Sequence, residues 1–180
     1  MKVIGFCGLP GSGKSTAINA IKDLGTVITM GDVIRKEAQE RNIELSDENL
    51  GKIAKQLREE EGDEIIAEKS VRYVKMQNTD VIFIDGIRSI PEVKVFRKYW
   101  KFPLIAIISS DDLRFKRISE RSRSDDSKTL SQIKERDKRE IGFGLKEVIL
   151  EANYKLENNS TIASLEQKTR ELILDIIRKY

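Results

Sequence analysis

The chain has 180 residues, 39% of them hydrophobic and 35% charged, so it can bury roughly 70% of its unfolded surface and is too apolar to be a disordered tail. Its 33 Lys and Arg nearly balance its 30 Asp and Glu, and a net charge of +3 does not favour general coating of DNA. One cysteine and no histidine exclude an intramolecular disulfide, a multi-cysteine zinc site and a Ser-His-Asp triad.

Alternating apolar segments and turn residues predict a succession of strands and helices. Strands are expected at 2–7, 27–29, 81–84, 104–108 and 154–156. Helices are expected at 13–24, throughout 33–76 with a break at Gly62, from Pro91 to about 100, from 113 to about 121 after an Asp111 cap, at 133–140 and at 165–177. A loop is expected at 122–131 and a break at 142–144. Strands that are apolar on both faces indicate a parallel sheet covered by helices on both sides, in one α/β domain spanning residues 1–180.

The first predicted turn carries the most specific motif of the chain. Its residues are Gly8-Leu9-Pro10-Gly11-Ser12-Gly13-Lys14-Ser15, followed by Thr16. They fit G-x-x-x-x-G-K-[ST] between a strand and a helix, the context in which backbone N–H groups surround a polyphosphate. Lys14 can reach the β- and γ-phosphates and the Ser15 hydroxyl can ligate Mg²⁺, while the helix that follows directs its positive end at the same phosphates. The motif predicts a nucleoside triphosphate site in a P-loop NTPase fold, a three-layer α/β/α arrangement with about five parallel strands.

Arginines follow two other predicted strands. Gly31-Asp32-Val33-Ile34-Arg35 comes after the second strand, and Asp85-Gly86-Ile87-Arg88 after the third. Because ligands of open parallel sheets bind beyond the carboxyl ends of the strands, Arg35, Arg88 and the P-loop are expected to face one crevice. Converging arginines offset the repulsion between two anions, as a phosphoryl transfer requires. The chain has no Asn-Lys-x-Asp for guanine, and no second nucleotide motif supports an ABC or AAA machine.

These residues resemble the nucleoside monophosphate kinases, adenylate kinase in particular. Segment 31–35 is similar to that family's G-D-x-[LI]-R, and segment 81–88 to its L-x-D-G-[FY]-P-R. Segment 117–121 (Arg-Ile-Ser-Glu-Arg) is similar to its R-[IL]-x-x-R at the first hinge of the lid. The resemblance implies that Arg35 and Arg88 hold the acceptor phosphate, with Asp32 and Gly86 beside them, and that Asp85 lies near the magnesium. It also implies that Arg117 stacks on the ATP adenine and that Arg121 contacts the transferring phosphate.

The last fifth of the chain resembles a second kinase family. Segment 152–160 is similar to the A-D-x-x-I-x-N-x-G/S strand of dephospho-coenzyme A kinase, and the whole chain resembles an archaeal group related to both kinases. Two departures concern the acceptor. Ile87 stands where the family has proline before the arginine, and Glu92 stands where adenylate kinase has a glutamine that reads the AMP base. Glu92 can accept a hydrogen bond from an adenine or cytosine amine but cannot donate one. The alternative that stays open is a first-turn helix carboxylate beside Pro91.

The predicted reaction is Mg²⁺-dependent transfer of the ATP γ-phosphoryl group to a nucleoside monophosphate, AMP favoured. The acceptor phosphate is its own nucleophile at pH 7, which suits a chain without histidine. Lys14, Arg88 and Arg121 are the expected catalytic residues, Ser15 and Asp85 hold the metal, and region 33–76 binds the acceptor. A short lid at about 121–140 closes the site, and which of Arg114, Arg117, Arg121, Arg123 and Arg136 enter it stays open.

Two alternatives stay open. A dephospho-coenzyme A-type kinase would need a base for its hydroxyl acceptor, for which Asp32 is placed, and a nucleotide sensor would bind ATP with little turnover. Nucleic acid is not an expected partner, because the Arg-rich stretch 114–139 is interrupted by acids and almost lacks aromatic residues. With no apolar run of ~18 residues, and with a strand where a cleavable signal would lie, a cytoplasmic protein is expected. The sequence does not indicate an oligomeric state.

Overall fold

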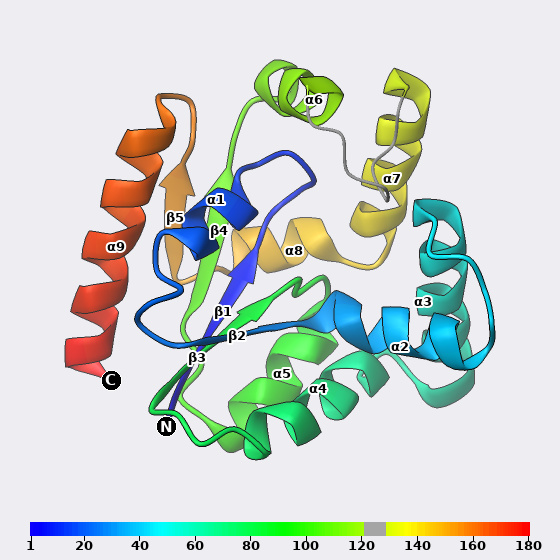
Figure 1. Cartoon of the computed structure of the whole chain (residues 1–180), viewed down its shortest axis with the longest axis horizontal. Helices are drawn as coiled ribbons and strands as arrows, with labels where there is room; N and C mark the ends of the chain where they lie inside the picture. The colour runs from blue at the N-terminus through cyan, green and yellow to red at the C-terminus, as the bar shows by residue number, and fades with distance from the viewer. Residues whose placement is uncertain (121–128) are drawn as a thin grey trace.

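The computed structural model describes residues 1–120 and 129–180, and its centre is a parallel sheet (Figure 1). The strands are β1 (Lys2–Cys7), β2 (Thr26–Thr29), β3 (Val81–Asp85), β4 (Leu104–Ile108) and β5 (Tyr154–Glu157). They lie in the order β2-β3-β1-β4-β5, and every neighbouring pair is parallel. All carboxyl ends therefore meet at one edge of the sheet, as the sequence predicts.

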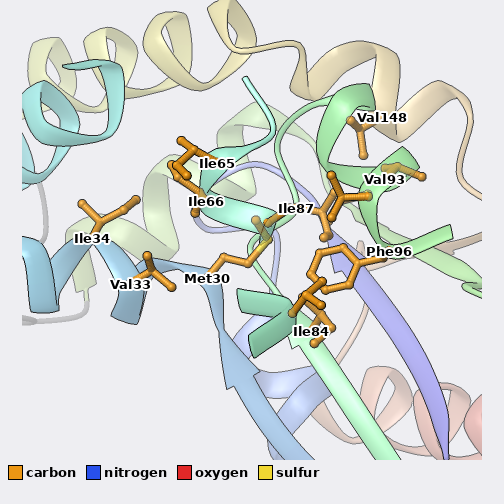
Figure 2. Close-up of a cluster of buried hydrophobic side chains, with 14 of the residues drawn as sticks. Met30, Val33, Ile34, Ile65, Ile66, Ile84, Ile87, Val93, Phe96 and Val148 are labelled. Carbon is orange, nitrogen blue, oxygen red and sulfur yellow. The ribbon is translucent and has the colours of Figure 1, made fainter. Parts of the chain in front are cut away.

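Helices cover both faces of this sheet. They are α1 (Lys14–Asn19), α2 (Met30–Glu40), α3 (Asp47–Glu61), α4 (Ile65–Lys75), α5 (Ile90–Tyr99), α6 (Asp111–Glu120), α7 (Leu130–Gly142), α8 (Leu145–Leu150) and α9 (Ile162–Lys179). On one face α1 and α9 pack on Ile4, Phe6 and Phe83. On the other, α2 to α5 and α8 form a larger apolar cluster, in which Met30, Ile84 and Phe96 lie together (Figure 2). The result is the three-layer α/β/α arrangement expected of the sequence.

Three predicted elements differ from the observed ones. The first helix ends at Asn19 rather than near residue 24, because the chain continues in tight turns with Ile21 N–H bonded to Ile18 O and Leu24 N–H to Ile21 O. Region 33–76 is three helices: the break at Gly62 is the predicted one, whereas the break near Asn42 was not predicted, and both residues have positive φ. Helix α8 was not predicted, since six residues are too few for a helical period to show.

The expectation that every strand is apolar on both faces holds for the inner strands only. The side chains of β1, β3 and β4 are almost all buried, whereas β2 is half-buried and β5 alternates half-buried with exposed positions. Both β2 and β5 are edge strands, which have one neighbour and are covered less completely. Among the described residues, no helix is both long and apolar enough to pass through a bilayer.

Candidate functional site

The loop between β1 and α1 has a backbone that only glycine adopts easily. Gly8, Gly11 and Gly13 have φ angles of 144°, 77° and 103°. There is also no space for a side chain at two of these positions. A Cβ on Gly8 would lie 2.4 Å from the Ile107 carbonyl oxygen, and one on Gly13 would lie 2.2 Å from Asn158 Nδ2. The glycine spacing of the motif is therefore required both by backbone angle and by close contact with β4 and with the turn after β5.

Lys14 lies over this loop. Its Nζ donates to the Gly8 carbonyl oxygen at 2.8 Å. Burial lowers the pKa of Lys14, and the nearby charges of Asp85 and Glu140 oppose that effect. Helix α1 has only six residues, so its dipole is short, and the positive potential of the loop comes mainly from the lysine and the backbone N–H groups.

A cavity of about 470 Å³ opens at the carboxyl ends of the strands, with the P-loop as one wall. Its lining includes the predicted P-loop residues 8–16 and, from other elements, Thr29, Gly31, Arg35, Asp85, Gly86, Ile87, Arg88, Arg117, Glu120, Arg136, Glu140, Asn158, Ile162 and Leu165. The structure thus brings Arg35, Arg88 and Lys14 to one cavity. Arg117 also lines it, and its guanidinium donates to Ser109 Oγ and to the Asn158 carbonyl oxygen, both at 3.0 Å.

Two buried oxygens at this cavity have no hydrogen-bond partner. Asp85 Oδ1, at the end of β3, and Ser12 Oγ, in the P-loop, are both inaccessible and unpaired. Buried polar atoms are nearly always hydrogen-bonded, so unpaired ones beside a cavity fit a bound ligand. Carboxylate and hydroxyl oxygens are the donor types that Mg²⁺ prefers, and Asp85 and Ser15 both line the same cavity. The residues present therefore fit a magnesium–nucleotide complex.

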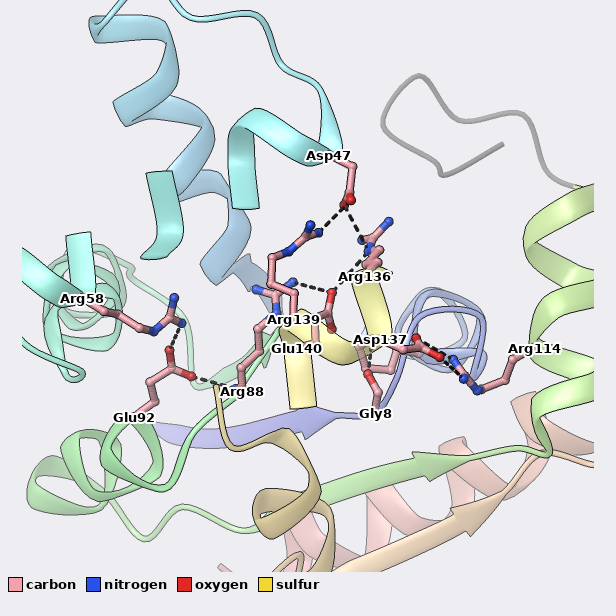
Figure 3. Close-up of polar contacts among 11 residues, drawn as sticks. Gly8, Asp47, Arg58, Arg88, Glu92, Arg114, Arg136, Asp137, Arg139 and Glu140 are labelled. Carbon is pink, nitrogen blue, oxygen red and sulfur yellow. Dashed lines mark hydrogen bonds and ion pairs between the residues drawn. The ribbon is translucent and has the colours of Figure 1, made fainter. Parts of the chain in front are cut away.

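Glu140 of α7 is a buried carboxylate in the cavity wall. Its Oε1 accepts from Arg88 Nη2 at 3.4 Å and from Arg136 Nε at 3.3 Å (Figure 3). Burial by itself would raise the pKa of Glu140, but the positive charges of Arg88, Arg136 and Lys14 outweigh it and lower the pKa to about 2. In turn, the charge of Glu140 raises the pKa of Arg88. Glu140 is thus ionised at neutral pH and faces the arginines expected to hold an acceptor.

A side pocket of about 70 Å³ adjoins the cavity between α2, α3 and α7. It shares Arg35, Arg88, Arg136 and Glu140 with the main cavity, and α3 contributes Asp47, Leu50, Gly51 and Ala54. Asp47 pairs with Arg139 at 2.7 Å and with Arg136 at 3.2 Å, which joins α3 to α7 (Figure 3). An acceptor that enters this side pocket therefore meets several guanidinium groups held by carboxylates.

Arg114 of α6 supports the P-loop from below. It is 1% exposed, and its guanidinium donates to the Pro10 carbonyl oxygen at 2.5 Å and to Asp111 at 3.0 Å. It also donates to both carboxylate oxygens of Asp137 (Figure 3). Arg114 does not line the cavity. Of the arginines whose entry into the site the sequence did not decide, Arg117 and Arg136 line the cavity. Arg114 is instead buried and connects the P-loop to α7 through its bonds to Pro10 and Asp137.

Of the two predictions for Glu92, base reading is wrong and a first-turn helix carboxylate is confirmed. Its side chain is fully buried at the start of α5, away from the cavity lining. Oε1 pairs with Arg58 Nη2 at 2.6 Å, and Oε2 accepts from the backbone N–H groups of Arg88 and Ser89 at 2.7 and 3.2 Å. The sequence Ser89-Ile90-Pro91-Glu92 forms a capping box, so local helix chemistry, not base recognition, accounts for this residue.

Asp32 also departs from its predicted position. Its side chain is 69% exposed, pairs with Arg35 Nη1 at 2.6 Å and does not line the cavity. It lies in the first turn of α2, because that helix begins at Met30, directly after β2. Arg121 and Arg123 lie outside the described residues, as does the first part of the expected lid. The rest of that lid, up to residue 140, is α7, which begins with a Thr129–Gln132 capping box.

Among the cavity-lining residues that sequence reasoning missed, Glu140 and Asn158 make contacts with distant segments of the chain. The i, i+4 spacing of Arg136 and Glu140 was a signal for a pair, but not for its burial. Asn158 Nδ2 donates to the Ser12 carbonyl oxygen at 2.8 Å, which ties the turn after β5 to the P-loop. No local pattern indicates a contact between residues so far apart in the chain.

Comparison with known proteins gives the family. A family model described as AAA domain matches residues 4–142, although the sequence lacks a second motif of an AAA machine. A UPF0200 protein of Methanosarcina barkeri is 38% identical over 99% of this chain and 98% of its own length. The chain belongs to the UPF0200 family. It also matches a UPF0200/UPF0201 protein of Archaeoglobus fulgidus at 43% identity over 99% of the chain, but it spans only 57% of that relative.

Solved structures share the fold of this UPF0200 protein. TT1252 from Thermus thermophilus matches with a TM-score of 0.60 and 18% identity over 97% of both chains. Shikimate kinase from Acinetobacter baumannii, solved in complex with shikimate, matches with a TM-score of 0.59 and 17% identity over 97% of this chain and 94% of its own. The chain therefore has the P-loop kinase fold of these proteins. The specific resemblance to adenylate kinase stays a prediction.

Proposed function

We propose that this UPF0200 protein transfers the γ-phosphoryl group of ATP to a nucleoside monophosphate, with Mg²⁺ as cofactor and AMP as the first acceptor to test. The observation that carries the proposal is the cavity that joins the P-loop and Lys14 to Arg35, Arg88 and Arg136. Positive groups from several elements that line one cavity suit two phosphate-bearing substrates held end to end.

On the donor side, the backbone of residues 8–13 binds the β- and γ-phosphates. Lys14 leaves the Gly8 carbonyl and follows the γ-phosphoryl group as negative charge moves to the leaving oxygen. Ser15 and Asp85 would hold the metal, with Thr16 beside Ser15 at the start of α1. When bound, the metal would neutralise charge on the phosphates. Arg117 packs on the adenine, and Arg121 of the lid contacts the transferring group.

On the acceptor side, Arg35 and Arg88 hold the monophosphate, with Gly86 beside them and the helices of region 33–76 around the nucleoside. An oxygen of that phosphate forms the new bond to the γ-phosphorus while the bond from this phosphorus to the β–γ bridging oxygen breaks. The acceptor phosphate is mostly a dianion at pH 7 and needs no general base. With Glu92 buried, no described side chain is assigned to the base, so the nucleobase preference is for the assay to determine.

A hydroxyl acceptor, as in dephospho-coenzyme A kinase, is the second candidate. The unpaired Asp85 Oδ1 beside the cavity favours it, because a hydroxyl nucleophile needs an oxygen to accept its proton. Asp85 lines the cavity, whereas Asp32, the base that the sequence indicates, does not. The arginines that line the side pocket also suit a small anionic acceptor, such as the shikimate bound to the A. baumannii kinase.

Acceptor-dependent release of ADP from Mg-ATP tests these candidates. The panel is AMP, CMP, UMP, GMP, dephospho-coenzyme A and shikimate, with a reaction lacking acceptor and the Lys14→Ala variant as controls. We expect release with a nucleoside monophosphate, and its loss in the variant together with weaker ATP binding. Release only with a hydroxyl acceptor selects the second candidate. ATP binding with no release for any acceptor contradicts transfer and leaves a nucleotide sensor.

A further inference from the structure

Glu140 occupies the guanidinium groups that an acceptor phosphate would need. Its Oε1 accepts from both Arg88 and Arg136, and all three side chains line the main cavity as well as the side pocket. The carboxylate is therefore an internal anion of this protein, bound where a ligand anion would bind (Figure 3).

The contacts of Glu140 are long compared with those of the other buried glutamate nearby. Glu92 pairs with Arg58 at 2.6 Å and uses both oxygens, whereas Glu140 reaches Arg88 and Arg136 at 3.4 and 3.3 Å through one oxygen. Charge-assisted N–H···O bonds are normally about 2.7–2.9 Å, so the hydrogen bonds of Glu140 are longer than usual. Glu92 has the contacts of a fixed structural carboxylate, whereas Glu140 interacts with Arg88 and Arg136 mainly through charge, an attraction that an incoming phosphate would also have.

The charges around the side pocket favour such a replacement. Its described lining carries four arginines, Arg35, Arg88, Arg136 and Arg139, and two carboxylates, Asp47 and Glu140. Four unopposed guanidinium groups would retain any phosphate that entered, and a diphosphate product more than a monophosphate substrate, because Coulomb attraction grows with the ligand's charge. Glu140 offsets part of that attraction inside the pocket.

We propose that Glu140 is a positioning residue that competes with the acceptor phosphate for Arg88 and Arg136 and thereby speeds release of the product. This inference rests on the proposed function. In the ligand-free protein Glu140 holds both arginines toward the cavity. The acceptor phosphate then takes the place of the Glu140 carboxylate at these arginines. After transfer, the negative charge of Glu140 repels the product, which is more negative than the acceptor. The Glu140 carboxylate therefore lowers the affinity of the pocket for anions and raises the rate of product release.

The test measures anion binding without turnover. Mg²⁺ and a non-hydrolysable ATP analogue saturate the P-loop, and methyl phosphate is titrated by calorimetry into wild type, Glu140→Gln and Glu135→Gln. Glu135 is exposed on the same helix, so its variant loses the same charge without touching the cavity. We expect Glu140→Gln to bind methyl phosphate about tenfold more tightly than wild type, and the Glu135 variant to match wild type. Unchanged or weaker binding in Glu140→Gln overturns the proposal.

Turnover gives the second measurement. With the acceptor found in the panel, Glu140→Gln is expected to lower both KM for the acceptor and kcat, with a burst of product in the first turnover. A merely structural role predicts a higher KM, or a lower kcat with no burst, and would overturn the proposal. If Glu140→Gln does not fold, Glu140→Asp retains the charge but withdraws it from Arg88 and Arg136, and a smaller tightening of methyl phosphate binding is expected.

The two proposals fail in different ways. Tighter methyl phosphate binding in Glu140→Gln, with no release of ADP for any acceptor, refutes the proposed function and retains the competition at the arginines. Normal ADP release with no change in methyl phosphate binding refutes the role of Glu140 and retains the function.

Discussion

The ion pairs of Glu140 make the stability of the protein depend on pH in a predictable way. Its pKa is about 2 in the folded protein, below its ordinary 4.5. A carboxyl with a lowered folded pKa stabilises the protein above its unfolded pKa, and the contribution disappears as pH falls through the folded pKa. A shift of that size corresponds to about 3 kcal/mol at pH 7, falling to about 2 kcal/mol at pH 3.5.

Glu140→Gln removes this contribution. We expect urea unfolding to show the variant less stable than wild type by about 3 kcal/mol at pH 7, with the difference shrinking by about 1 kcal/mol at pH 3.5. Glu135→Gln is the control for loss of one carboxylate from α7, and it should change stability little at either pH. A difference that stays constant between the two pH values would show that the loss comes from packing rather than from ionisation, and would refute the reasoning.

Three further predictions concern other residues. Arg88→Ala should leave ATP binding nearly intact and abolish most of the transfer, as seen by calorimetry and ADP release; lost ATP binding with intact acceptor affinity would contradict its placement. Gly13→Ala should weaken ATP binding at least tenfold, because φ is 103° and the new Cβ meets Asn158 Nδ2 at 2.2 Å; wild-type affinity would refute this. Glu92→Gln should destabilise the fold by about 3 kcal/mol in urea melts, since Arg58 loses a buried partner, without altering the order of preferred nucleotides; a changed order would restore base reading by Glu92.

The sequence was sufficient to predict those parts of the structure that are determined by residues close together in the chain. The P-loop is recognisable because its glycines are required by backbone angles within the loop itself. Strand β4 lies at 104–108 as predicted, because an uninterrupted apolar run suits a strand covered on both faces. Parallel strands also bring their carboxyl ends together, which is why Arg35 and Arg88 could be assigned to one crevice.

Contacts between distant segments were decided by the tertiary structure alone. Glu140 and Arg88 are 52 positions apart, and Asn158 and Ser12 are 146 apart, so neither pair leaves a periodic signal in the sequence. At Glu92 the capping box with Ser89 is a local signal, whereas its pairing with Arg58, 34 positions away on α3, has none. The sequence by itself determined the P-loop, the alternation of strands and helices and the direction of the strands, because these depend on local backbone and side-chain preferences. Which charged side chains are buried, and against which partners, was decided by packing, because the energy of a buried charge depends on groups that the fold brings to it.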